Sequence, residues 1–250
     1  MEPQPALDLI RPAIFADLPG VTAGFSTRAG GVSDAPFDAL NMGFATGDDE
    51  AAVQENRRRF LSVLGFGPDH LATIGQVHGV SVTARSEPGF AERNDGHVTD
   101  RRGLALGILV ADCGAVLLAD AKAGVVGACH AGWRGAVGGI PIMTVEAMRK
   151  LKAEPERIRA YVSPCIGPDD FEVGTEVARQ FDDAHVLEDD AWTKPHVDLS
   201  GAIVAQLLKA GLDEANIQVE GCSTFDTARF FSYRADGGTT GRMMGVIGLT

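Results

Sequence analysis

The sequence lacks any apolar run approaching the ~20 residues that a membrane-spanning helix needs. Its N-terminal segment, MEPQPALDLIRP, has neither the basic region nor the apolar core of a secretion signal. Paired cysteines are also missing, because Cys113, Cys129, Cys165 and Cys222 are widely spaced and form no CxxC motif. Isolated cysteines of this kind are typical of reduced thiols in a reducing compartment. These absences together predict a soluble, cytoplasmic protein.

Basic residues are scarce. The chain has 22 Lys and Arg against 34 Asp and Glu, which gives a formal net charge of -12 at pH 7. The longest basic run, Arg57 to Arg59, lies in a helical pattern flanked by acids. Because net negative charge repels phosphate backbones and anionic lipids, we expect no nucleic-acid partner and no membrane surface. With 45% hydrophobic residues in 250, the chain can bury a large core, as one domain or as two closely packed halves.

One segment in the middle of the chain carries the clearest strand pattern. Its first part, Leu104–Ala111, is an uninterrupted apolar run typical of a strand buried on both faces. After a polar break, the apolar arms Ala115–Ala119 and Val125–Cys129 flank a four-residue turn and predict a β-hairpin. If the arms pair symmetrically about that turn, Cys113 and His130 lie together at the open end of the hairpin.

Helical and extended patterns alternate irregularly along the rest of the chain. Between Glu87 and Asp100 the composition is polar and predicts a loop, with Asp95-Gly96-His97 as its turn. Because the hairpin argues against a purely parallel sheet, the pattern predicts an α+β fold with mixed sheets. Four segments have helical spacing or helix caps: Asp48–Leu64, Ile140–Leu151, Val173–Phe181 and Asp198–Ala210.

Three potential metal ligands, His78, Cys113 and His130, each lie where a predicted strand begins or ends. Two imidazoles and a thiolate suit a first-row metal, with zinc as the default and copper as an alternative. Because three protein ligands leave a position for water or substrate, the count favours a catalytic site over a structural one. The wide spacing of the ligands matches no compact zinc motif, so a buried thiol with two hydrogen-bonded core histidines is the alternative.

The same residues also fit a cysteine enzyme without metal. Cys113 would be the nucleophile and His130 its base, with Asp112 or another polar group orienting the imidazole. A multicopper cluster needs many more imidazoles than this chain has, since its six histidines are His70, His78, His97, His130, His185 and His196.

Two arginines are candidates for binding an anion. Arg57 falls on the apolar stripe of its predicted helix, where an inward-facing guanidinium needs either a core carboxylate or a bound anion. Arg134 follows His130 closely, between Trp133 and Gly135, where it would grip a phosphate or a carboxylate, or form a structural ion pair with Asp112.

Several motifs together resemble the YfiH/YlmD family, which is also called the laccase-domain or polyphenol-oxidase family. The resemblance extends from about Gly24 to Arg242, and the block HAGWRG at His130 to Gly135 is its most specific part. The other matching motifs are GFSTRAGGVS from Gly24, NMG from Asn41, ENR from Glu55, QVHG from Gln76, ADC from Ala111, SPCIGP from Ser163 and FFSYR from Phe230.

The resemblance implies a single α+β domain over residues 1–250, with mixed sheets packed between helical layers, similar to cysteine hydrolases of the toxin deamidase type. Family members are described as zinc-dependent purine nucleoside phosphorylases that act on adenosine, inosine and methylthioadenosine and also deaminate adenosine. Copper-dependent oxidation of polyphenols has been attributed to the family as well. The partners that we expect are therefore a small-molecule nucleoside and phosphate.

By motif, the resemblance makes His78, Cys113 and His130 the metal ligands. In deamination, Cys113 and His130 would lie at the reaction centre, with Asp112 moving protons. In phosphorolysis, Arg57 or Arg134 would anchor phosphate. Asn41 and Gln76 would contact the base or the ribose. A Cys–His hydrolase of cell-wall or peptide amides and a metal-binding protein without enzymatic activity are the rival hypotheses.

Overall fold

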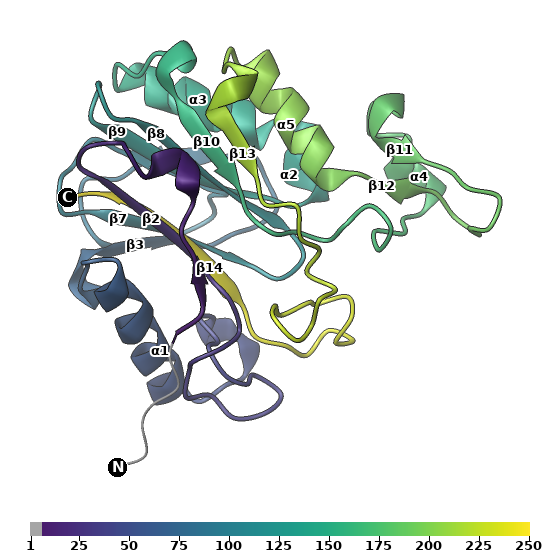
Figure 1. Ribbon diagram of the computed structural model, residues 1–250, viewed down its shortest axis with the longest axis horizontal. Coiled ribbons are helices and arrows are strands. Elements are labelled where there is room, and N and C mark those ends of the chain that lie inside the picture. The colour runs from purple at the N-terminus through teal and green to yellow at the C-terminus, as the bar shows by residue number, and fades with distance from the viewer. Residues whose placement is uncertain (1–6) are drawn as a thin grey trace.

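The computed structural model describes residues 7–250, in which two six-stranded mixed β-sheets are stacked on each other (Figure 1). Residues 1–6 lie outside the described residues. They include the first half of the segment that we inspected for a secretion signal and the start of the predicted domain. The first sheet has the strand order β1 (Leu9–Ile10), β2 (Val21–Ser26), β14 (Met243–Leu249), β7 (Ala105–Val110), β3 (Leu71–Ile74) and β5 (Gly89–Ala91).

The second sheet contains the predicted hairpin as its two central strands. In the hairpin, Ala115 lies opposite His130 and Asp120 opposite Val125, so the arms pair symmetrically about the turn as the sequence predicts. The strand order is β13 (Ile217–Val219), β10 (Arg159–Val162), β8 (Gly114–Asp120), β9 (Val125–Ala131), β6 (Gly96–Thr99) and β4 (Val82–Ala84).

The largest buried side chains lie between the two sheets and on their outer faces. Between the sheets, Leu106 and Ile108 of β7 pack with Leu117 of β8 in one cluster. On the outer face of the first sheet, Phe60 and Leu61 of α1 (Glu50–Val63) pack against β14. The outer face of the second sheet is covered by α3 (Ile140–Lys150) and α5 (Leu199–Lys209), as Figure 1 shows. The order of layers is therefore helix, sheet, sheet, helix, which confirms the predicted α+β fold.

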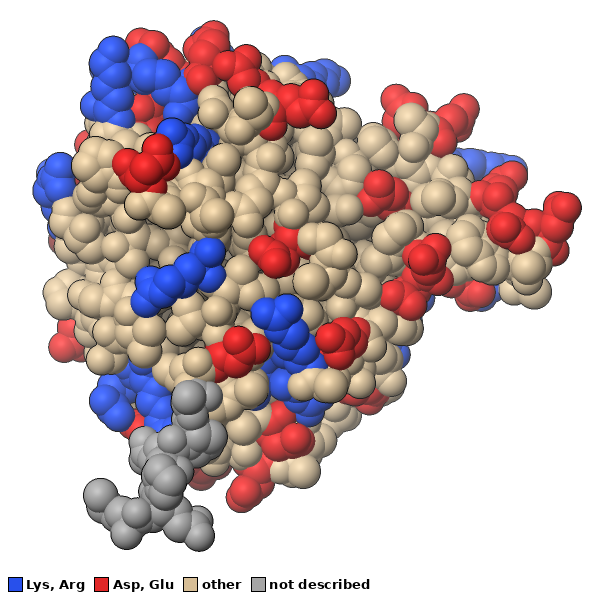
Figure 2. All heavy atoms as spheres, viewed as in Figure 1, with Lys and Arg blue, Asp and Glu red and all other residues tan. Residues whose placement is uncertain are grey.

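A small arm projects from the second sheet and its helices (Figure 1). It contains α4 (Thr175–Ala178) and the antiparallel pair β11 (Val186–Leu187) and β12 (His196–Val197). In the space-filling view, acidic side chains gather on this arm, whereas basic side chains are scattered among acidic ones over the rest of the visible face (Figure 2). No helix within residues 7–250 has the length and apolar character to cross a membrane.

Two local predictions differ from the structure, and one helix was not predicted. The segment Glu87–Asp100 is not simply a loop, because β5 and β6 lie within it, and pairing with strands distant in the chain outweighs its polar composition. The helix predicted at Val173–Phe181 is shortened to the single turn of α4. The motif after His130 forms a helix, α2 (Trp133–Gly138), for which no element was predicted from the sequence.

Candidate metal and substrate site

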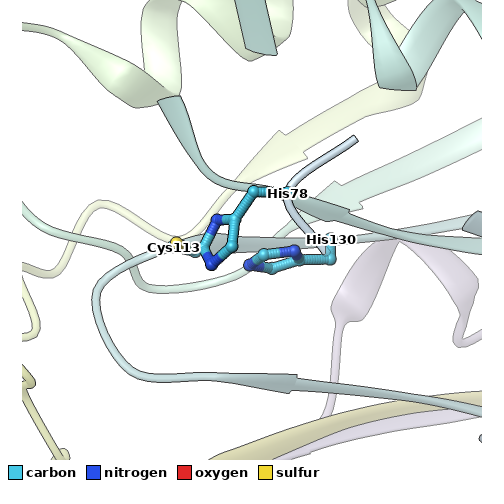
Figure 3. Close-up of side chains that lie close together, drawn as sticks. All are labelled: His78, Cys113 and His130. Carbon is cyan, nitrogen blue, oxygen red and sulfur yellow. The ribbon is translucent and has the colours of Figure 1, made fainter. Parts of the chain in front are cut away.

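The two sheets bring His78, Cys113 and His130 together at one edge. His130 lies near the end of β9, Cys113 lies in the connection from β7 to β8, and His78 follows β3. One potential ligand atom from each lies within 4.8 Å of the others, and the rings of His78 and His130 meet edge to face with centroids 4.8 Å apart. Figure 3 shows the two imidazoles and the thiol pointing toward one another. Within residues 7–250 this is the one cluster of three or more such ligands.

A buried carboxylate, Asp95, holds both histidines. Its Oδ1 accepts hydrogen bonds from His130 Nδ1 at 2.9 Å and from the His78 backbone N–H at 2.9 Å. Its Oδ2 accepts from the backbone N–H groups of Gly79 at 2.7 Å and Val77 at 3.2 Å. The bond to Nδ1 leaves His130 Nε2 available as a ligand, which is the usual arrangement of carboxylate, histidine and metal. Asp95 is therefore the orienting group for His130, the role for which the sequence named Asp112 or another polar group.

The backbone on either side of the cluster adopts unusual conformations. His78 has φ of 59° and Asp112 has φ of 85°, a region that residues other than glycine enter only when their surroundings hold them there. The Asp112 carboxylate accepts hydrogen bonds from Thr224 Oγ1 at 2.7 Å, Ser232 Oγ at 2.6 Å and the Arg234 N–H at 2.7 Å. These bonds fix the residue before Cys113 to the loop that precedes β14.

The glycine after the hairpin, Gly132, leaves room for the three ligands. A Cβ atom at this position would lie 2.8 Å from Cys113 Sγ and 3.0 Å from His78 Nδ1. Any side chain there would displace the thiol or the ring. The requirement for close approach explains the first glycine of the motif HAGWRG in physical terms.

The charges of the cluster favour a thiolate. Burial alone would raise the pKa of the Cys113 thiol, but hydrogen bonds from His130 and His78 bring it down to about 7. Burial alone would lower the pKa of His130, but its contacts with Asp95 and Cys113 raise it to about 9. Without metal these shifts favour a Cys113 thiolate beside a protonated His130, and a divalent metal would displace that proton and bind the thiolate together with two neutral imidazoles. The three residues therefore fit zinc or another first-row metal.

The cluster opens into a cavity of about 1520 Å³ that runs toward α1. Its wall includes the apolar side chains of Phe44, Leu109, Trp133, Ile166 and Phe171. Such a volume exceeds the ~300–1,000 Å³ of an ordinary small-molecule pocket, so it has room for a nucleoside together with a second ligand.

The predicted substrate residues take different positions around this cavity. Gln76 lines it, but the side-chain amide already donates to Leu109 O at 2.7 Å and accepts from Leu109 N–H at 2.9 Å. Arg57 also lines it, whereas Arg134 is exposed, stacks on Trp133 with 4.2 Å from its Cζ to the ring centroid, and is not part of the wall. Among residues 7–250, neither arginine forms the carboxylate ion pair that the sequence left open: the Asp112 oxygens bind other groups, and Arg57 Nε donates to Met42 O.

Asn41 is fully buried and lies behind the cavity wall. Its amide donates to Thr46 Oγ1 at 2.9 Å and Asp48 Oδ2 at 2.8 Å, and its oxygen accepts from the N–H groups of Gly43 and Arg242, each at 2.9 Å. The side chain therefore shapes the loop that faces the cavity without facing it.

Comparisons with known proteins agree over almost the whole chain. A family model described as multi-copper polyphenol oxidoreductase laccase matches residues 22–250. A purine nucleoside phosphorylase of Deinococcus radiodurans is 48% identical over 98% of this chain and 94% of its own. Among solved structures, the hypothetical protein YfiH of Bacillus licheniformis superposes with a TM-score of 0.91 at 29% identity, covering 98% of this chain and 97% of that one. YlmD of Geobacillus stearothermophilus superposes with a TM-score of 0.86 at 34% identity, covering 93% of each chain.

Proposed function

The chain belongs to the family described as multi-copper polyphenol oxidoreductase laccase, as its motifs predict, and we propose that it is a zinc-dependent purine nucleoside phosphorylase. The observation that carries the proposal is the cluster of His78, Cys113 and His130 at one end of a cavity large enough for a nucleoside and phosphate. The name of the Deinococcus radiodurans relative supports the reaction class. The proposed substrates are inosine, adenosine and methylthioadenosine.

Phosphorolysis moves ribose from a purine to phosphate. A phosphate oxygen forms a bond to C1′ while the C1′–N9 bond breaks, and its electron pair leaves with the purine, which takes up a proton. The apolar side chains of Phe44, Ile166 and Phe171 would enclose the purine and exclude water. Arg57 would neutralise the phosphate, since it lines the cavity and Arg134 does not. The amide group of Gln76 would contact the ribose while keeping its hydrogen bonds to Leu109.

Zinc fits the three ligands, because Asp95 fixes the tautomer of His130 and Gly132 leaves space beside the thiolate. When bound, zinc would supply a Lewis acid that stabilises charge on the leaving base and activates water for the deamination of adenosine, the second activity that we propose. Asp112 has three hydrogen bonds to its carboxylate, so we assign it the positioning of Cys113 rather than proton transfer. A cytoplasmic location is also proposed, since all four cysteines are free.

The test combines metal content with turnover. Protein purified without added metal or a nickel column is analysed by mass spectrometry and assayed with inosine in phosphate buffer. We expect about one zinc per chain, formation of ribose 1-phosphate, and loss of both in Cys113→Ala. Turnover of inosine that is unaffected by removal of zinc and by Cys113→Ala would contradict the proposal.

One observation favours a second function. Cys113, His130 and Asp95 form a continuous chain of thiol, imidazole and carboxylate, which is also the arrangement of a cysteine hydrolase. Such an enzyme, acting on cell-wall or peptide amides, would stay active without metal and be inactivated by alkylation of Cys113. The copper-dependent polyphenol oxidase is less well supported, because the single cluster found within residues 7–250 contains two histidines and a multicopper centre requires many more.

A further inference from the structure

Two part-buried arginines on the cavity wall, Arg57 and Arg242, have no carboxylate partner among residues 7–250. Arg57, in α1, donates from Nε to Met42 O at 2.8 Å. Arg242, just before β14, donates from Nη1 to the carbonyls of Thr240 and Gly241, both at 2.8 Å. Neither forms an ion pair with any carboxylate of residues 7–250, and the remaining guanidinium nitrogens have no acceptor among these residues.

The two side chains reach the same short segment, Met42 to Gly43, although they are distant in the sequence. Arg57 binds the Met42 carbonyl, and the Met42 N–H donates to Arg242 O at 3.0 Å. The Cγ of Arg242 lies 2.9 Å from where a Cβ on Gly43 would be, so the glycine admits this side chain beside the segment. We call Arg57 and Arg242 the arginine pair.

Aromatic rings hold the pair in place. The Cζ of Arg57 lies 4.3 Å from the ring centroid of Phe44, and that of Arg242 lies 5.6 Å from the centroid of Tyr233. Both rings also line the cavity. Stacked guanidiniums keep their planar N–H groups available for a ligand at a low entropic cost.

Within residues 7–250 no carboxylate pairs with either member of the arginine pair. Burial lowers the pKa of Arg57 to about 10, and no neighbouring carboxylate opposes that effect. Burial also lowers the pKa of Arg242, while the charges of Tyr233, Asp112 and Cys113 act on it in the opposite sense, which places it within electrostatic reach of the metal-binding cluster. In a chain of net charge -12, two part-buried guanidiniums in one cavity without a carboxylate partner among residues 7–250 are a local exception.

We propose that the arginine pair is a phosphate-binding subsite, in which the two guanidiniums grip the oxygens of one phosphate group by paired hydrogen bonds. This inference rests on the proposed function for its biological meaning, because phosphorolysis requires bound phosphate close to the nucleoside. Two sources provide the same chemistry: inorganic phosphate, and the 5′-phosphate of a nucleoside monophosphate.

Adjacent to Arg57, Arg58 provides a matched control. It lies on the same helix and also lines the cavity, but its guanidinium is paired with Glu55 by contacts of 2.7 Å and 2.8 Å. If phosphate affinity came only from general positive charge, neutralising Arg58 would reduce it as much as neutralising Arg57.

The experiment measures binding without turnover. The full chain, as purified with its metal, is titrated with inorganic phosphate in chloride buffer by calorimetry, and then separately with inosine 5′-monophosphate. Arg57→Gln and Arg242→Gln should each raise the Kd for phosphate at least tenfold, and Arg57→Lys, which keeps the charge and loses the planar fork, should raise it by a smaller factor. Arg58→Gln should change it less than twofold, and thermal unfolding of each variant confirms that it is folded.

The two titrations distinguish inorganic phosphate from the 5′-phosphate of a nucleoside monophosphate as the ligand. If both variants weaken inorganic phosphate, the subsite takes the free anion; if they weaken only the monophosphate, it takes the ester, and either result supports the subsite. Equal losses in Arg58→Gln, or an unaltered protein that binds neither inorganic phosphate nor the monophosphate, would overturn it. If the protein binds phosphate through the arginine pair but does not convert inosine, the subsite is supported and the proposed function is refuted. If both variants, Arg57→Gln and Arg242→Gln, phosphorolyse inosine with an unchanged KM for phosphate and also bind the monophosphate as tightly as the unaltered protein, the proposed function stands and the subsite is refuted.

Discussion

Replacing Asp95 by asparagine tests whether one buried carboxylate assembles the metal-binding cluster. Oδ1 of Asp95 accepts from the His78 N–H and from His130 Nδ1, and Oδ2 accepts from the N–H groups of Val77 and Gly79. An asparagine amide has one acceptor and one donor end, so in either orientation its NH₂ group faces two N–H donors. About two charge-assisted hydrogen bonds are therefore lost whichever way the amide turns.

The loss has consequences for both stability and metal binding. With ~1.5–3 kcal/mol for each hydrogen bond to a charged group, Asp95→Asn should lower the free energy of unfolding by about 3 kcal/mol or more. If the NH₂ group faces His130, it favours the tautomer that is protonated on Nε2, which cannot bind metal through that atom. We expect zinc affinity to fall by about 10–100-fold, the usual effect of losing a carboxylate that orients a histidine ligand.

Two measurements on the full chain check these values: urea unfolding of the metal-free protein, and zinc titration in competition with a chelator. Asp100→Asn is the control, because Asp100 is exposed beyond the other end of β6 and its ion pair with Arg101 lies at the surface. The reasoning is refuted if Asp95→Asn binds zinc within twofold of the unaltered protein and unfolds at the same urea concentration.

Three further changes have expected outcomes. Gly132→Ala should abolish zinc binding while the fold is retained, measured as metal content and circular dichroism, because its Cβ would lie 2.8 Å from Cys113 Sγ. Asn41→Ala should weaken phosphate binding in calorimetry and cost about 2 kcal/mol in urea unfolding, since Asn41 binds the Arg242 N–H from a buried position. Asp120→Asn should cost about 2 kcal/mol at pH 7, because the buried carboxylate accepts hydrogen bonds from the Ala123 N–H, the Glu154 N–H and the Arg157 guanidinium, which outweigh burial and lower its pKa. That cost should persist above pH ~4 and disappear as the pH falls through the folded-state pKa, as followed by urea midpoints against pH.

The fold could be predicted where the pattern is local. The helix before Gly65 begins where the Asp49 side chain accepts from the Ala52 N–H, and α5 begins where Asp198 accepts from the Gly201 N–H. Both caps are short-range signals that the sequence contains in full. The symmetric hairpin was equally local. By contrast, β14 pairs with β2 and β7, which are more than 130 residues earlier in the chain, and such long-range pairing leaves no short-range signal.

The site was predicted in the same uneven way. The cluster of His78, Cys113 and His130 was predicted as a set, because each residue adjoins a strand end. Asp95 was missed as a site residue because its segment has the composition of a loop, and its role depends on β6 pairing with β9. Arg242 was not predicted as a phosphate ligand, because nothing in the neighbouring sequence shows that it lies beside the same loop as Arg57.

The acids that line the cavity bear on the reaction class. They are Glu55, which is paired with Arg58 and Arg59, and Asp112, whose carboxylate accepts three hydrogen bonds. Hydrogen bonds from both arginines lower the pKa of Glu55 to about 2, so it is a poor base for water near neutral pH. Neither carboxylate is therefore suited to act as the general base that deprotonates water. Phosphate arrives already ionised and needs a cationic anchor instead of a base. Arg57 and Arg242, which have no carboxylate partner among residues 7–250, are placed to supply that anchor for phosphorolysis.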